Sequence, residues 1–230
     1  MKTILGWLLF TGGLFAQFPP SPRPAEWQAD WYQISWEREK FEKRISTDTL
    51  YIHHTAGEGG YTWPALSDIG YKRQYELVYN LDLKVQFDPA VKGQVPYSGH
   101  FRMVNGVLTQ VFYAYHWIVY EDGRTERLLD DREVGWHSGN WNENMRSIGI
   151  VFDGDFTKKP PSKKALKAAA KLIAAYAKTF PITRFRGHFD NNTERRRTEC
   201  PGPWFNAKDK SGRTGRDVLL RMAKVKLVRE

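Results

Sequence analysis

The run Ser147–Phe152 (Ser-Ile-Gly-Ile-Val-Phe) constrains the fold more than any other segment of this 230-residue chain. It is almost wholly apolar, which is typical of a β-strand that is buried on both faces. Short runs rich in aromatic and branched residues predict further strands at 49–53, 112–120 and 182–185. The second of these is followed by Glu-Asp-Gly, which has the composition of a hairpin turn. The sequence therefore predicts a mixed sheet of at least four strands.

Two segments have the periodicity of amphipathic helices. Between Ser162 and Phe180, apolar residues recur at helical spacing, and Ser162 is a suitable N-cap after two prolines. A last helix is expected from Arg216 to Val228. The residues expected to face inward on it are Val218, Leu219, Met222 and Val225. Strands and helices together predict an α/β fold with a mixed central β-sheet flanked by helices.

The N-terminus predicts export from the cytoplasm. Lys2 precedes an apolar run from Ile4 to Ala16, which is shorter than the ~20 residues of a membrane-spanning helix, so we interpret residues 1–16 as a signal peptide. An uncleaved anchor or a buried helix is the alternative. We expect a periplasmic or secreted monomer with no transmembrane segment in the mature chain.

The rest of the chain divides into three parts. Prolines and aromatic residues predict an extended arm over 17–46, and one main domain is expected over 47–210. Within it, 61–111 is interpreted as an irregular excursion because it is rich in proline and glycine towards its end. Residues 211–230 are expected to form a C-terminal helix packed on the domain.

The formal net charge is +9, which favours a polyanionic partner. Nucleic acid, anionic lipid and acidic cell-wall polymer all fit this charge. No segment resembles a nucleic-acid-binding module, and export favours a partner in the cell envelope. We therefore expect no nucleic-acid partner.

The single cysteine, Cys200, cannot form an internal disulfide, and metal ligation would protect its thiol in an oxidising compartment. His53 and His54 are adjacent on a predicted strand, so only one of them can face a given site. His188 and Cys200 could bring a nitrogen and a sulfur ligand to the same place. Two histidines and a cysteine would leave the fourth position of a tetrahedral zinc open for water.

Seven short motifs around these residues occur in the order seen in zinc-dependent N-acetylmuramoyl-L-alanine amidases. They most resemble the branch that contains T7-type phage lysozyme and catalytic peptidoglycan recognition proteins. The motifs are Ile52-His53-His54-Thr55, Tyr115-His116-Trp117-Ile118, Gly135-Trp136-His137-Ser138-Gly139, Ser147-Ile148-Gly149-Ile150, Gly154-Asp155-Phe156, Gly187-His188 and Thr198-Glu199-Cys200-Pro201-Gly202.

This resemblance implies a peptidoglycan-recognition-protein-like amidase fold that binds Zn²⁺, and a role for each residue that matches a motif. The implied zinc ligands are His53, His188 and Cys200. Tyr115 matches a tyrosine that helps activate water and stabilise the oxyanion, and Thr198 matches a side chain aimed at the scissile carbonyl. The implied substrate contacts are Trp136, His137 and Asn144.

The implied reaction is hydrolysis by zinc-activated water. The bond cleaved would be the amide between N-acetylmuramic acid and the L-alanine of the peptidoglycan stem peptide. The cytoplasmic recycling-type amidases differ, because they carry a glutamate where this chain has Val151 and an aspartate where it has Cys200.

Two other functions stay open. The first is a peptidoglycan-binding protein without activity, although such relatives typically lack the cysteine ligand. The second is a cysteine hydrolase that uses Cys200 as nucleophile, although a catalytic thiol usually lies at a helix N-terminus and Cys200 precedes Pro-Gly-Pro. The arginine triplet at 195–197 is interpreted either as part of a solvated loop or as a contact for substrate carboxylates.

Overall fold

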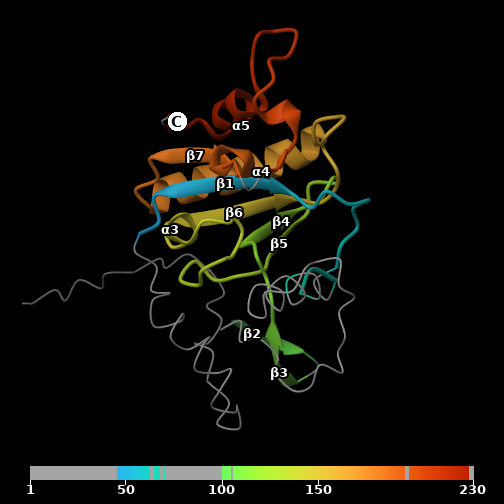
Figure 1. The fold of residues 1–230 in the computed structure, drawn as a ribbon, viewed down its shortest axis with the longest axis vertical. Helices are drawn as coiled ribbons and strands as arrows, with labels where there is room; N and C mark the ends of the chain where they lie inside the picture. The colour runs from blue at the N-terminus through green and yellow to red at the C-terminus, as the bar shows by residue number, and fades with distance from the viewer. Residues whose placement is uncertain are drawn as a thin grey trace, which may run out of the picture.

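A five-stranded mixed sheet lies at the centre of the molecule (Figure 1). The computed structural model describes residues 46–62, 65–67, 70, 100–104, 106–194 and 197–227. The strands are β1 (Thr49–His54), β4 (Trp117–Val119), β5 (Thr125–Arg127), β6 (Ser147–Phe152) and β7 (Arg184–Gly187). Their order is β5-β4-β6-β1-β7, with only β5 antiparallel to its neighbour. The predicted α/β class with a mixed central sheet is confirmed.

β6 is the middle strand of the sheet, between β4 and β1, and all six of its residues are buried. Its apolar sequence correctly predicted a strand that is buried on both faces. β1 also agrees with the prediction, whereas β7 begins two residues later than expected. The turn at 121–123 joins β4 to β5 as predicted, with Gly123 at φ +89°.

The strand predicted at 112–120 is wrong over its first half, since only Trp117–Val119 forms β4. Phe112 instead donates its backbone N–H to the Ser67 hydroxyl (3.0 Å). The backbone at Gly135 passes so close that a Cβ there would lie 2.3 Å from the Ala114 carbonyl oxygen. The loop at Gly135 therefore packs directly against the backbone of this segment.

The expected irregular excursion at 61–111 ends in regular structure. β2 (His100–Val104) and β3 (Val107–Val111) form an antiparallel pair, with Gly106 at φ +80° in the turn. This hairpin is a sheet separate from the central one (Figure 1). Most of the excursion, the predicted signal peptide and nearly all of the predicted arm lie outside the described residues.

Two helices cover one face of the sheet. α4 (Lys163–Thr179) begins as predicted, with the Ser162 hydroxyl accepting the N–H of Ala165 (3.0 Å). α5 (Gly215–Ala223) packs against α4. It ends five residues before the predicted position, because Lys224 adopts a left-handed conformation (φ 57°) that terminates the helix. Met222, expected to face inward, is 36% exposed; Leu220 and Ala223 are buried instead.

Each face of the sheet carries an apolar cluster, and the polar residues of the candidate site lie on the face away from α4 and α5. On one face, strand residues such as Leu50, Ile52 and Phe152 form the main core with buried residues of α4 and α5. Because side chains alternate along a strand, Tyr51 and His53 of β1 lie on the opposite face. The short helices α3 (Trp141–Asn144), η1 (His188–Asn191) and η2 (Pro203–Phe205) complete the fold. No helix within the described ranges is both long enough and apolar enough to cross a bilayer.

Candidate metal centre

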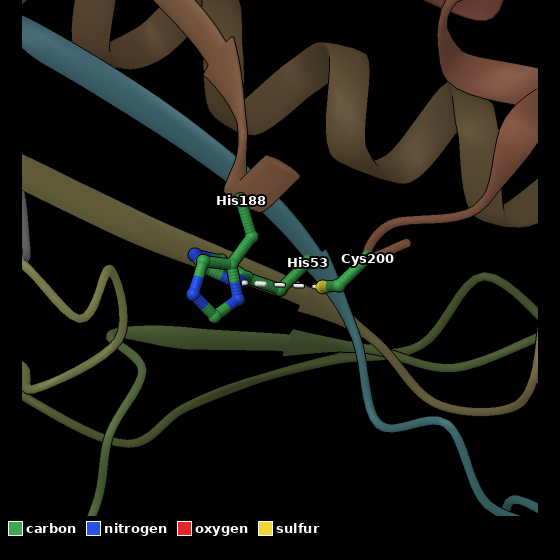
Figure 2. A group of neighbouring side chains, drawn as sticks. All are labelled: His53, His188 and Cys200. Atoms are coloured by element: carbon green, nitrogen blue, oxygen red, sulfur yellow. Dashed lines mark hydrogen bonds between the residues drawn. The ribbon is translucent and has the colours of Figure 1, made fainter. Parts of the chain in front are cut away.

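Three side chains from distant parts of the chain converge beside the face of the sheet that carries His53 (Figure 2). His53 comes from the end of β1, His188 is the first residue of η1 directly after β7, and Cys200 lies in the loop before η2. One ligand atom from each residue lies within 4.8 Å of the other two. The parallel pairing of β1 with β7 is what brings the first two together, since both strands end at the same edge.

His53 is fully buried and surrounded by aromatic rings. Its ring centroid lies 4.9 Å from that of His188, 5.0 Å from that of Tyr115 and 5.0 Å from that of His137. Its Nδ1 atom is 3.6 Å from the Cys200 Sγ atom. The neighbouring His54 lies on the other face, where its Nδ1 accepts the backbone N–H of Phe156 (3.2 Å). His54 therefore does not belong to the cluster.

The loop that carries Cys200 is fixed by backbone contacts. His54 donates its backbone N–H to Sγ (3.3 Å), and Phe189 donates its own to the Cys200 carbonyl (2.9 Å). A Cβ at Gly187 would lie 2.9 Å from the Pro201 ring, so glycine is needed there for the loop to approach β7. Together these contacts hold the sulfur beside the end of β1.

Burial disfavours charge on two members of the cluster, His53 and Cys200, in the absence of a cation. Burial lowers the pKa of His53 well below its usual range, and the neighbouring His188, His137 and His54 add to this effect. Burial raises the pKa of the Cys200 thiol to about 12, against a smaller opposite effect of the His54 N–H. A divalent cation would reverse the balance at the sulfur, because a metal ion stabilises a thiolate. Neutral imidazoles with one thiolate are a donor set that suits zinc.

The two residues with expected catalytic roles both lie next to the cluster. Tyr115 is half-buried, and its ring lies beside that of His53. Thr198 is half-buried, and its hydroxyl oxygen accepts the backbone N–H of Cys200 (3.1 Å). A pair of hydrogen bonds with Asn192 holds the Thr198 backbone in place. Of the arginine triplet, Arg195 and Arg196 fall outside the described residues, and Arg197 is exposed.

The three expected substrate contacts differ in accessibility. Trp136 is half-buried, whereas His137 and Asn144 are buried. The Asn144 side-chain oxygen accepts the N–H of Ser138 (2.9 Å), so it fixes the loop between 135 and 140. The Nδ1 atom of His137 lies 3.0 Å from the Nε2 atom of His53, so His137 is in hydrogen-bond contact with a candidate ligand. Substrate contact stays a prediction for all three residues.

Sequence reasoning named His137 only as a substrate contact and missed the hydrogen-bonded group that it forms beside His53. Hydrogen bonds link His137 to Ser147 and Ser147 to Glu143. The His137 Nε2 atom lies 3.1 Å from the Ser147 hydroxyl, and that hydroxyl donates to the Glu143 carbonyl (2.6 Å). The only signal in the sequence was the glycine of Ser-Ile-Gly-Ile within a strand, since an interior glycine often marks a close approach.

The comparisons with known proteins identify the family of this chain. Residues 43–203 match the Amidase_2 family of N-acetylmuramoyl-L-alanine amidases. Peptidoglycan-recognition protein 1 of Holotrichia diomphalia is 38% identical over 71 residues, which cover 31% of this chain and 35% of that protein. The matched region thus spans about a third of that relative.

Two solved structures share the fold at low sequence identity. The endolysin amidase LysCS from Clostridium intestinale URNW has a TM-score of 0.52 at 19% identity and covers 80% of this chain and 87% of its own. The endolysin of Thermus scotoductus bacteriophage Ph2119 has a TM-score of 0.50 at 20% identity, with coverages of 85% and 97%. The family match covers well over half of the chain, so this protein belongs to the N-acetylmuramoyl-L-alanine amidase (Amidase_2) family.

Proposed function

We propose that this protein is a zinc-dependent N-acetylmuramoyl-L-alanine amidase that acts on peptidoglycan. The observation that carries the proposal is the approach of His53, His188 and Cys200 to within 4.8 Å inside the matched family region, with His53 and Cys200 buried and His188 half-buried. Three protein ligands are typical of a catalytic zinc site, because they leave one coordination position for water or substrate. A structural zinc site would have four.

The chain's own residues have separate tasks in this reaction. His53, His188 and Cys200 would hold the metal, and the contacts of the Cys200 loop keep the sulfur in place. When bound, zinc supplies a Lewis acid, which polarises an amide carbonyl and makes water a stronger acid.

Tyr115 and Thr198 are the residues that we assign to the developing oxyanion. The Tyr115 ring centroid lies 5.0 Å from that of His53, and this proximity supports the assignment of its hydroxyl group to the oxyanion. The Thr198 oxygen accepts from the Cys200 N–H, which leaves its own hydrogen available to donate. Preorganised donors of this kind stabilise the charge that develops in the transition state.

Peptidoglycan as the substrate agrees with the strongly basic composition, because cell-wall polymers are acidic. It also agrees with the predicted export, since the substrate lies outside the cytoplasm. The Trp136 side chain is the most accessible of the three expected substrate contacts, and we assign it the contact nearest to the site.

The deciding experiment is product analysis by mass spectrometry after incubation with defined peptidoglycan. We expect a free lactyl carboxylic acid on the muramic acid and a free amine on L-alanine. Cys200→Ser is the matched control, and it should lose both bound zinc and product formation. Zinc-loaded protein that binds sacculi but releases no peptide would contradict the proposal and support a recognition protein.

A cysteine hydrolase would respond to inhibitors in the opposite way to a zinc amidase. Burial raises the pKa of Cys200 to about 12, whereas a nucleophilic cysteine needs a lowered pKa, which favours the zinc amidase. For a zinc amidase, chelators should abolish activity and iodoacetamide should leave the zinc-loaded enzyme active. Inactivation by iodoacetamide without loss of metal would favour the cysteine hydrolase.

A further inference from the structure

We propose that His137 is a positioning residue that fixes the tautomer of His53, so that the Nδ1 lone pair of His53 faces the metal. This inference rests on the proposed zinc site. It concerns a row of hydrogen bonds that runs from β1, through the loop before α3, to β6 and the end of α3. The direction of each bond follows from the chemistry of the one before it.

The row begins at a backbone carbonyl, which can only accept. The Ser147 hydroxyl oxygen lies 2.6 Å from the Glu143 carbonyl oxygen, so the single hydroxyl hydrogen of Ser147 is donated there. Towards His137 the same hydroxyl can then only accept. The Nε2 atom of His137, 3.1 Å away, must therefore carry a hydrogen.

The next bond follows in the same way. A neutral imidazole with its hydrogen on Nε2 has a lone pair on Nδ1. His137 Nδ1 lies 3.0 Å from His53 Nε2, so His53 must donate from Nε2. Neutral His53 then has its lone pair on Nδ1, the atom that lies 3.6 Å from Cys200 Sγ. This is the lone pair that a metal between His53 and Cys200 requires.

The His137 side chain is closely packed and only 3% exposed. Its ring lies over Gly149 of β6, where a Cβ would come within 2.8 Å of the ring atoms Cγ and Cδ2. Gly149 is thus the residue that gives the ring its place between β6 and His53. Any larger side chain there would push the ring away from the sheet.

The far end of the row is also anchored. The Glu143 side chain accepts from the Tyr51 hydroxyl (2.9 Å) and from Arg184 (3.1 Å), and Arg186 lies 3.5 Å from it. These contacts fix the position of Glu143 on two strands of the sheet. The Glu143 carbonyl is therefore held in a fixed position, where it accepts the hydroxyl hydrogen of Ser147.

The test compares the zinc affinity of variants by competition with a metal indicator. His137→Phe keeps a ring of similar size but removes the acceptor, and we expect it to weaken zinc binding by about 10- to 100-fold. His137→Asn keeps an oxygen that can accept from His53 Nε2, so it should restore most of that loss. A merely structural role for His137 would not distinguish Phe from Asn in this direction.

A serine pair provides the matched control. Ser147→Ala removes the hydroxyl that fixes the His137 tautomer, so it should also weaken zinc binding. Ser138→Ala removes another buried hydroxyl, which donates to the Asn140 carbonyl (2.9 Å) and has no bond to His137, so it should bind zinc as the native protein does. Equal effects of the two changes would overturn the proposal.

A direct readout does not depend on any variant folding. Nitrogen-15 NMR of the metal-free native protein should show His53 with its hydrogen on Nε2. A hydrogen on Nδ1 would overturn the inference, as would native zinc affinity in His137→Phe. Failure of the proposed function looks different, because native protein with the expected tautomer would then bind zinc weakly or release no product.

Discussion

Gly149→Ala is the substitution that most sharply tests how β6 shapes the site. The new Cβ would lie 2.8 Å from two atoms of the His137 ring, whereas carbon atoms pack at about 3.5–4.0 Å. The ring must therefore move by about 0.7–1.2 Å, which is enough to strain or break its 3.0 Å hydrogen bond to His53. We expect about 1–3 kcal/mol of overpacking cost in the free energy of unfolding. Zinc affinity should fall by about 10-fold or more, because His53 loses its support.

The assay is urea unfolding together with zinc titration against an indicator. Ile150→Val is the control, because Ile150 lies next to Gly149 on β6 but is buried in the core on the opposite face. It should cost about 0.5–1.5 kcal/mol and leave zinc affinity unchanged. If Gly149→Ala is destabilised but binds zinc as tightly as Ile150→Val, then the position of the His137 ring does not control the metal site.

Three further predictions concern catalysis, packing and pH. Tyr115→Phe should keep bound zinc and lose about 100- to 1,000-fold in turnover, measured as product release; full activity would remove the role given to its hydroxyl. Arg216→Ala leaves the Asp190 carboxylate, 2.7 Å from Arg216, without its ion-pair partner, and should cost about 3–5 kcal/mol in urea unfolding; a cost below about 1 kcal/mol would contradict this. Burial raises the pKa of Asp48, but hydrogen bonds from Arg146 and two hydroxyl groups outweigh it and lower the value from 3.8 to about 2. This lowered pKa adds stability that is present above about pH 4 and is lost as the pH falls towards 2; after allowance for solvent screening it amounts to about 1 kcal/mol. Asp48→Asn should flatten that part of the stability profile, and an unchanged profile would show that Asp48 contributes little.

The parts of the fold that local patterns determine could be predicted from the sequence. β6 has an unbroken apolar run and α4 has both a capping serine and helical periodicity, so each is specified by its own residues. The first half of 112–120 has equally strong strand composition but lies outside the ladder. The loop at Gly135, which comes from elsewhere in the chain, packs against this segment, and local composition does not reveal such a contact.

The candidate site divides in a similar way. Motifs pointed to His53, His188 and Cys200, because ligand chemistry limits the residue types that can serve. The row behind His53 could not be predicted, since it joins residues 53, 137 and 147 by distances that only the folded sheet defines. Ser147 in that row, and Gly149 under the His137 ring, are ordinary strand residues until their neighbours in the fold are known.

The histidine pair at the end of β1 has a consequence for assembly. A slip of β1 by one residue would still present an imidazole at the site, because His54 would replace His53. The metal therefore cannot distinguish the correct register from the slipped one by ligand type. The distinction comes from Leu50 and Ile52, each fully buried, whose removal from the core would cost roughly 1.5–3 kcal/mol per side chain. Zinc added to unfolded chain can capture either histidine, so we expect the highest yield of correctly loaded protein when the sheet folds first and the metal is added last.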